Sequence, residues 1–408
     1  MPEINTGNTA WVLMSAALVL LMTPALGFFY GGLVRQKNVL STIMHSFFIL
    51  ALISVSWALI GYTLAFGPDR GGLIGGFEYI GLRNISGVVM EGSGIPLPAY
   101  VIFQGAFAVI TPALITGAFA ERKRFKAFVI FSLLWSTLVY SPVAHWVWAT
   151  GGWLFDYGAM DFAGGTVVHI TSGVSALVAA MYLGRRVGFG NEKMDPHALW
   201  MTVLGAALLW FGWFGFNAGS ALAADGLAAM AFVVTNLSAA MGVLSWMTVS
   251  WIRHGQPSVL GAAAGAVAGL VGITPAAGYV SPASALVIGF GAGVLCFFAV
   301  ELLKDRLKVD DALDVFAVHG VGGIWGALAT GIFADSSING VGNDGLLQGN
   351  PEQLWKQFVA VVAVGAFAAV ASVIILKVVD LMVGVRVPEE QEVLGLDPSQ
   401  HGEVAYQL

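Results

Sequence analysis

The chain has few charged residues and almost no cysteine, and each shortage excludes a class of protein. Only 10% of its 408 residues are charged, with 18 basic and 24 acidic side chains, whereas a soluble domain carries about 25%. So few charges cannot cover a surface that faces water. No basic block of the kind that grips a phosphate backbone is present, so nucleic acid is excluded as a partner.

The single cysteine, Cys296, permits neither an internal disulfide nor a thiolate cluster. The histidines are not joined by Asp, Glu or Cys at ligand spacing, so we predict no metal and no cofactor. What the sequence has in excess is apolar: 57% of the residues are hydrophobic, and the mean hydropathy is +0.81. The surroundings of such a chain must be largely lipid.

Eleven apolar runs lie between polar breaks, each of about the 20 residues that a helix needs to cross a hydrocarbon core of about 30 Å. The runs lack the alternation expected of the strands of a membrane barrel. We therefore predict an all-α polytopic membrane domain over 1–387 and a polar tail over 388–408. The predicted spans lie at about 9–33, 40–66, 98–120, 125–149, 162–184, 197–218, 226–252, 257–276, 281–303, 313–333 and 354–384.

The basic residues predict the orientation of these spans, because Lys and Arg collect in cytoplasmic loops. Fifteen of the 18 follow odd-numbered spans or flank the end of the eleventh, and only Arg70, Arg83 and Lys356 lie on the other side. We predict the N-terminus outside and the C-terminus inside. No basic residue precedes Arg35, so the start lacks the charged region of a signal peptide and the first span is expected to remain.

Glycine is abundant, with 53 residues that form small-xxx-small patterns such as Gly261, Gly265 and Gly269. Such patterns let helix backbones approach closely in lipid, so we expect them to serve packing. Whether they pack helices of one chain or of neighbouring chains is open at this point.

The spans divide into two sets of five, at about 9–184 and 197–333, followed by the last span at about 354–384. Because five is odd, the second set enters the membrane in the opposite sense, which is the arithmetic of an inverted repeat. The last span of each set carries an acid and then a histidine, Asp161 with His169 and Asp314 with His319. At 1.5 Å per residue, each histidine lies about 10 Å from its end of the span, so the pair should straddle the midplane.

An ionisable residue at that depth usually marks a substrate or proton pathway. The alternative is a histidine that bridges two helices by hydrogen bonds, and we favour that interpretation for His45 and His145, which lie nearer span ends. For His169 and His319, at related positions in the two halves, we favour the pathway. A neutral imidazole pair could hydrogen-bond an uncharged polar solute or relay a proton.

Aromatic residues gather at the outer ends of several spans, accompanied by one hydroxyl and one carboxylate. An interfacial aromatic belt explains most aromatic residues of a membrane protein. This subset differs from an ordinary aromatic belt because Asp161 and Ser220 lie at the same level. A ring face attracts a cation by roughly 0.5 to 2 kcal/mol, and a hydroxyl supplies a hydrogen-bond acceptor. Together they indicate a receptor for a small cation. The set comprises Phe103, Phe107, Trp148, Asp161, Trp213, Phe216 and Ser220.

These residues resemble the ammonium transporter, methylammonium permease and Rh family, and its prokaryotic Amt branch in particular. The resemblance covers nearly the whole chain and includes several motifs in order. They are Phe29 to Asn38, Phe103 to Phe107, Asp161 to His169, Trp213 to Ser220, Val315 to Gly320 and Val385 to Glu392. The Rh branch generally differs at the positions of Trp148 and Ser220, so the chain is similar to a true Amt protein.

The resemblance implies a homotrimer in the prokaryotic plasma or inner membrane, with a narrow pore in each eleven-span protomer. It implies an outer ammonium site at Phe107, Trp148 and Ser220 with Phe103 close by, and methylammonium as an analogue. It further implies a gate formed by Phe107 and Phe216. Below the gate, it implies that His169 and His319 form the pore and proton relay, with Trp213 as their neighbour. Asp161 would support recruitment and deprotonation without direct contact to the substrate.

The tail is expected to be disordered from its polar, acidic composition. In the family it docks beneath the trimer, and the cytoplasmic pore mouth binds a PII-type signalling protein, so the resemblance implies such a partner here.

Deprotonation explains how such a pore would separate ammonium from potassium. A bare ion pays a large desolvation penalty in apolar surroundings, which ammonium evades by giving up a proton. We therefore predict ammonium uptake with proton co-transfer, which makes transport electrogenic, and no enzyme activity. A membrane enzyme is disfavoured because 320–326 fails the dinucleotide pattern. An electroneutral ammonia channel and an ammonium sensor without transport stay open as alternatives.

Overall fold

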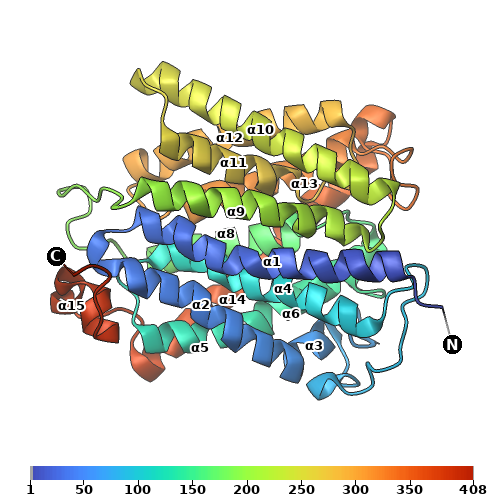
Figure 1. The fold of residues 1–408 in the computed structure, drawn as a ribbon, viewed down its shortest axis with the longest axis horizontal. Helices are drawn as coiled ribbons and strands as arrows, with labels where there is room; N and C mark the ends of the chain where they lie inside the picture. The colour runs from blue at the N-terminus through green and yellow to red at the C-terminus, as the bar shows by residue number, and fades with distance from the viewer. Residues whose placement is uncertain (1–2, 408) are drawn as a thin grey trace.

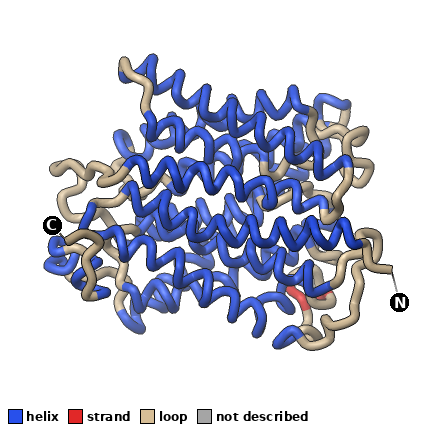
Figure 2. The backbone as a smooth tube through the Cα atoms, viewed as in Figure 1, coloured by secondary structure: helices blue, strands red, loops and turns tan. Residues whose placement is uncertain are grey.

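The computed structural model describes residues 3–407 as a bundle of long helices that run side by side in roughly the same direction (Figures 1 and 2). Within those residues, ten helices are long and apolar enough to cross a membrane. They are Thr6–Leu33, Gln36–Phe66, Leu97–Phe119, Phe125–Tyr157, Gly165–Leu183, Leu199–Ala221, Gly226–His254, Pro282–Arg306, Phe316–Phe333 and Pro351–Val383. Together with the shorter apolar helix Val259–Ile273, they correspond in order to the eleven predicted spans.

Several of these spans consist of more than one regular segment. The α-helices are α1 (Thr6–Leu33), α2 (Val39–Ser56), α3 (Tyr62–Phe66), α4 (Leu97–Ile115), α5 (Phe125–Trp135), α6 (Ser141–Trp148), α7 (Trp153–Tyr157), α8 (Thr171–Leu183), α9 (Leu199–Ala218), α10 (Gly226–His254), α11 (Val259–Ile273), α12 (Pro282–Glu301), α13 (Gly322–Phe333), α14 (Pro351–Val383) and α15 (Glu389–Leu394). Two short antiparallel strands, β1 (Asp69–Arg70) and β2 (Ile74–Gly75), form a hairpin.

The loops gather at the two ends of the bundle, which we call the N-face and the C-face. The N-face holds the start of the chain and the β1–β2 hairpin (Figures 1 and 2). The helix α7 lies beside this hairpin, since the backbone N–H of Trp153 donates to the Gly72 oxygen at 3.1 Å. The C-face holds the loops at 120–124 and 184–198 and the tail after Val383, including α15 (Figure 1).

Burial separates the central helices from the outer ones. In the span that begins with α4, 94% of the apolar window is buried, whereas α10, α12 and α14 bury 39% each. The exposed faces of the outer helices carry large apolar side chains such as Phe290, Phe358 and Trp251. Apolar side chains that face outward along whole helices suit a lipid environment rather than water.

Small residues bring the helices of this chain into close contact. A Cβ atom added to Gly289 on α12 would collide with the backbone of Ser238 on α10, and one added to Gly265 on α11 would collide with the backbone of Gly242. Gly205 on α9 meets the backbone of Phe29 on α1 in the same way. These glycines therefore pack helices within one chain, which answers for them the question that the sequence left open.

Two helices begin with a π-helical turn that carries a histidine. The turn η6 (Gly165–Ile170) precedes α8 and contains His169, and the turn η9 (Phe316–Val321) precedes α13 and contains His319. Single π turns inside α-helices are frequent at functional sites. The last span of each predicted half thus shares one local device.

The tail is folded, and the prediction of disorder is wrong. It forms α15 and the turn η11 (Asp397–His401), and the side chains of Glu392 and Asp397 are buried. The Asp397 carboxylate accepts hydrogen bonds from the backbone N–H groups of Leu40 and Ser41, at 3.0 and 2.7 Å, where α2 begins. The composition did not reveal this because the partners lie in other segments: Asp397 binds N–H groups at the start of α2, which lack an intrahelical acceptor, and Glu392 accepts from the Val187 N–H.

Candidate functional site

The predicted cation receptor forms the wall of a cavity on the N-face. The cavity has a volume of about 130 Å³. Its lining comes from α4, the end of α6, the segment before η6 and the turn after α9, so residues far apart in the chain meet here. The lining residues are Tyr100, Phe103, Gln104, Phe107, Trp148, Phe162, Ser220 and Leu222.

The aromatic rings of this cavity meet edge to face. The ring centroids of Phe103 and Phe107, one turn apart on α4, lie 5.0 Å apart, and those of Phe107 and Trp148 lie 5.8 Å apart at 85°. The indole N–H of Trp148 donates to the backbone oxygen of Asp161 at 2.9 Å, which fixes the ring. The hydroxyl of Ser220 donates to the Phe216 carbonyl at 2.8 Å, so its oxygen retains lone pairs that can accept.

Beneath this cavity, Phe107 and Phe216 close the way inward. Their centroids lie 4.4 Å apart with the ring planes tilted by 41°, and both side chains are buried. The structure therefore brings the two residues of the predicted gate into contact, although they come from α4 and α9.

A narrow apolar passage follows the two phenylalanines. Its volume is about 10 Å³, which is close to the space of one water molecule. Apart from the two histidines and Trp213, the lining side chains are apolar: Met22, Leu26, Phe29, Ile110, Leu114, Val168, Leu209, Phe216 and Val267.

His169 and His319 face each other across this passage. Their Nδ1 atoms lie 3.2 Å apart, and the ring centroids lie 5.3 Å apart at 24°. His169 also stacks on Trp213, whose indole N–H donates to the Thr274 hydroxyl at 2.9 Å. Two neutral imidazoles at this distance share one Nδ1 proton, so one ring donates and the other accepts, and the accepting ring carries its proton on Nε2.

Asp161 lies next to the cavity but points its carboxylate at the backbone. Its two oxygens accept from the N–H groups of Gly164, Gly165, Thr166 and Val167 and from the Thr166 hydroxyl. Gly164 has a φ of 116°, a conformation that favours glycine and lets the chain wrap around the carboxylate. The carboxylate thereby holds the start of η6, the turn that carries His169.

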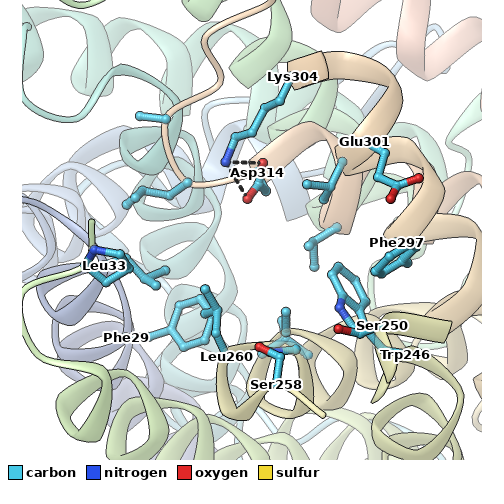
Figure 3. A pocket seen from close by; sticks show the side chains of 18 of the residues that line it. Phe29, Leu33, Trp246, Ser250, Ser258, Leu260, Phe297, Glu301, Lys304 and Asp314 are labelled. Carbon is cyan, nitrogen blue, oxygen red and sulfur yellow. Dashed lines mark hydrogen bonds and ion pairs between the residues drawn. The ribbon is translucent and has the colours of Figure 1, made fainter. Parts of the chain in front are cut away.

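A second, larger cavity opens on the C-face and reaches His319 from the other side. Its volume is about 710 Å³, and its wall includes the ion pair between Lys304 and Asp314 (Figure 3). Sequence reasoning used Asp314 only as the symmetry mate of Asp161 and missed Lys304. Both residues precede His319 in the sequence, and this proximity of two opposite charges to an intramembrane histidine was the available signal.

The other two histidines singled out from the sequence differ from each other. His145 bridges segments, with Nδ1 2.9 Å from the Ala65 oxygen and Nε2 2.9 Å from Asp69 Oδ1, which confirms its structural interpretation. His45 does not bridge, because neither ring nitrogen has a hydrogen-bond partner within residues 3–407. It packs among aromatic rings instead, so the bridging interpretation is wrong for His45.

Buried ion pairs tie the loops of the C-face together. Glu121 pairs with Arg35 at 2.7 Å and with Arg186 at 3.2 Å, and Arg186 pairs with Asp310 at 2.7 Å. Burial opposes the charge of Glu121, but Arg186 and Arg35 outweigh it and lower the pKa of this carboxyl. Among the described residues, no three His, Cys, Asp or Glu side chains converge to hold a metal ion.

Comparison with known proteins gives consistent matches along the chain. The model of the Ammonium Transporter Family matches residues 10–406. An ammonium transporter of Bacillus subtilis is 52% identical over 405 residues, with 99% of each chain covered. Ammonium transporter Amt1 of Archaeoglobus fulgidus is 48% identical over 403 residues, with 99% of this chain and 100% of its own length covered.

Solved structures are similar as well. Mep2 of Candida albicans has a TM-score of 0.91 at 38% identity and covers 99% of this chain and 91% of its own. Mep2 of Saccharomyces cerevisiae has a TM-score of 0.89 at 38% identity, with 95% and 91% covered. A structure described as a sensor Amt protein has a TM-score of 0.90 at 28% identity, with 97% and 98% covered.

Proposed function

The chain belongs to the ammonium transporter family, and from this premise we propose that it takes up ammonium by binding the cation, removing a proton and passing ammonia between two histidines. The observation that carries this proposal is the Nδ1 contact of His169 and His319, at 3.2 Å, directly beneath the closed pair Phe107 and Phe216. A proton-sharing pair inside an apolar passage suits a solute that must lose its charge to enter.

Recruitment takes place in the N-face cavity, which in this proposal faces the outside. Ring faces and edges of Phe103, Phe107 and Trp148 surround an ion that has shed part of its water, and the Ser220 oxygen accepts one of its N–H groups. Methylammonium, with one methyl group in place of a hydrogen, is an analogue that the apolar wall tolerates.

Selection takes place at the gate and in the passage. A cation in a dry passage of about 10 Å³ has no room for a hydration shell. Ammonium avoids this penalty by leaving a proton behind, and potassium has no proton to leave. Ammonia then donates to, or accepts from, the imidazoles of His169 and His319, stacked beside Trp213.

The fate of the proton decides whether transport carries charge. The shared Nδ1 proton gives the two rings a relay, in which a proton taken by one ring on the N-face side is released by the other toward the C-face cavity. We propose that the proton follows the ammonia by this relay and that transport is electrogenic. Asp161 supports both steps, because it fixes Trp148 through its backbone oxygen and η6 through its carboxylate.

The surroundings of the pore follow from the same proposal. From the basic loops we infer that the C-face lies in the cytoplasm and the N-face outside, in a prokaryotic plasma or inner membrane. The two five-span halves form the inverted repeat, and three copies form a homotrimer. A PII-type signalling protein at the C-face is the partner that the family resemblance implies.

The experiment that tests this function records currents from reconstituted proteoliposomes on a solid-supported membrane. A jump in ammonium at fixed pH should give a current, and an equal jump in potassium should give none. Silence with ammonium, together with alkalinisation of the lumen, would contradict electrogenic transport and favour an ammonia channel.

A sensor without transport is the second candidate, and the likeness to a sensor Amt protein favours it. Its recruitment cavity would be the same, so binding alone does not separate the two functions. Silence in both the current and the alkalinisation assays, with intact ammonium binding, would favour the sensor.

A further inference from the structure

The C-face cavity begins where the histidine passage ends. It is lined by His319 at its inner end and is far wider than the passage, at about 710 Å³ against about 10 Å³. A solute that leaves the histidines therefore enters a space with room for water. Ammonia that arrives there is protonated again. The groups of this cavity that can bind a cation are therefore exposed to newly formed ammonium.

One carboxylate in this cavity is free of backbone partners. The oxygens of Asp314 lie 2.7 and 2.8 Å from Nζ of Lys304, and within residues 3–407 they accept from no other group. Asp161, at the related place before the other histidine, has its oxygens filled by backbone N–H groups. The two acids thus differ in what they can bind, although their positions in the two halves correspond.

Glu301 is the other acid of the cavity wall that forms ion pairs within residues 3–407, and its partners are an arginine and a histidine. Glu301 pairs with Arg253 at 3.1 Å and lies 3.5 Å from His254 Nε2. Its carboxylate points away from Asp314 (Figure 3). Arg253 has a planar guanidinium that fits a carboxylate and bears no likeness to an ammonium ion.

Lys304 presents to Asp314 the chemical group that the proposed pore transports. Its ε-ammonium is a primary alkylammonium with three N–H donors, and methylammonium belongs to the same chemical class. Figure 3 shows Lys304 reaching from the end of the α12 segment to Asp314 at the edge of the opening. The structure therefore displays a carboxylate site for an ammonium group, occupied by the chain itself.

We propose that Asp314 is a binding site for ammonium on the exit side of the pore and that Lys304 is its built-in competitor. This inference rests on the proposed function of the pore. A group tethered by a short flexible stem has an effective concentration on the order of millimolar. Lys304 thereby keeps Asp314 from retaining ammonium at lower concentrations in the cytoplasm, and the exit stays clear.

The pair is suited to such exchange because it is not locked. The side chains of Lys304 and Asp314 are 31% and 28% exposed, and partly exposed ion pairs are weak. Incoming ammonium can therefore displace Nζ when its concentration is high, and Nζ can return when it falls. Release of product then needs no change of the surrounding helices.

The test measures inhibition by ammonium at the C-face. The full-length protein is reconstituted, and the orientation of the vesicles is determined from protease access to the tail. The current after a fixed ammonium jump is recorded while the lumen is preloaded with increasing ammonium. In Lys304→Met the lumenal ammonium concentration that halves the current should fall by about fivefold, because the tethered competitor is gone and a partly exposed ion pair of this kind shifts an equilibrium by about that factor.

Three further variants make the result specific. Lys304→Arg should show no added inhibition, because a guanidinium holds the Asp314 carboxylate at least as firmly as Lys304 does. Lys304→Met combined with Asp314→Asn should lose the added inhibition because the site itself is removed. Lys308→Met, which removes an exposed lysine from the same face, should change nothing.

The outcomes separate this inference from the proposed function. A normal ammonium current with unchanged lumenal inhibition in Lys304→Met would overturn the exit site and leave the transport function standing. Added inhibition that persists in the double variant would also overturn it, because the inhibition would not involve Asp314. No ammonium current in the wild type would overturn the proposed function itself.

Discussion

The Nδ1 atoms of His169 and His319 lie 3.2 Å apart, so the two rings share one proton and take opposite roles at that contact. Which ring donates is not fixed by any other partner of His169, since its Nε2 has none within residues 3–407. The two arrangements can therefore interchange by moving protons along the pair. This freedom is what a relay requires.

Removal of either imidazole should interrupt this relay. In His169→Ala and in His319→Ala, the ammonium current should fall at least about tenfold, because a positioned proton-transfer group contributes roughly 10²- to 10⁴-fold. Discrimination against potassium should change as well, since space opens in the passage. Currents on a solid-supported membrane measure both quantities. His45→Leu is the matched control, because His45 is buried away from all three cavities. Unchanged current and unchanged selectivity in both alanine variants would rule out the relay.

The gate should depend on the contact between Phe107 and Phe216. Phe107→Ala removes one of two rings whose centroids are 4.4 Å apart and opens the dry passage to hydrated ions. We expect a potassium current that the wild type lacks, measured after a potassium jump at constant pH. Phe232→Ala, which removes one ring of the pair Phe214 and Phe232 on the exposed side of the bundle, is the matched control. Strict exclusion of potassium by the Phe107 variant would mean that the phenylalanines do not form the barrier.

Asp161 should contribute to stability as well as to transport. Asp161→Asn replaces one accepting oxygen by an N–H group that faces backbone N–H groups, so we expect a loss of about 3 kcal/mol in the free energy of unfolding. Thermal unfolding in one detergent compares the variants. Asp225→Ala, which removes the side-chain cap of α10, should cost only about 1 kcal/mol. Equal losses in the two variants would show that the backbone contacts of Asp161 carry no special weight.

Asp311 gives the protein a pH-dependent stability. Burial and the nearby Asp314 carboxylate raise the pKa of Asp311 to about 6. A raised pKa means that this acid stabilises the fold when protonated, below about pH 4, and that the stabilisation is lost as the pH rises to about 6. Because one pKa unit corresponds to about 1.36 kcal/mol, Asp311→Asn should be more stable than the wild type by on the order of 3 kcal/mol at pH 7.

The advantage of Asp311→Asn should largely disappear at pH 4, where the wild-type carboxyl is protonated in the folded state and about half protonated in the unfolded state. Unfolding midpoints at pH 4 and pH 7 give the comparison. The exposed acid Asp305, changed to Asn, should show no such pH dependence. An advantage of the same size at both pH values would show that ionisation of Asp311 is not its cause.

The folded tail should support transport through its contacts with the loops. Truncation after Val387 removes Glu392, which pairs with Arg386 at 2.9 Å, and Asp397, which holds the start of α2. We expect a lower ammonium current at equal amounts of protein in the membrane. Truncation after Gly402 keeps both contacts and serves as the control. Full current in the variant that ends at Val387 would show that the tail does not contribute to transport.

The sequence by itself determined the spans, because the thickness of a membrane sets the length of an apolar helix. The eleven predicted runs match helices in the structure. The contact between Phe107 on α4 and Phe216 on α9 was implied by the family resemblance and not by helical spacing. His169 and His319 were predicted to straddle the midplane from their related positions in the two halves, and the family resemblance implied that they form a pair; their Nδ1 atoms lie 3.2 Å apart.

The tertiary structure alone decided which polar atoms face which. The Asp161 carboxylate binds backbone N–H groups, and His45 packs among aromatic rings without a hydrogen-bond partner for its ring nitrogens within residues 3–407. The acidic tail packs against the start of α2, and Asp314 pairs with Lys304. Each of these depends on a partner from another segment. Hydrophobic burial is a property of one stretch of chain and can be read from it, whereas a hydrogen bond or an ion pair exists only once two stretches have met.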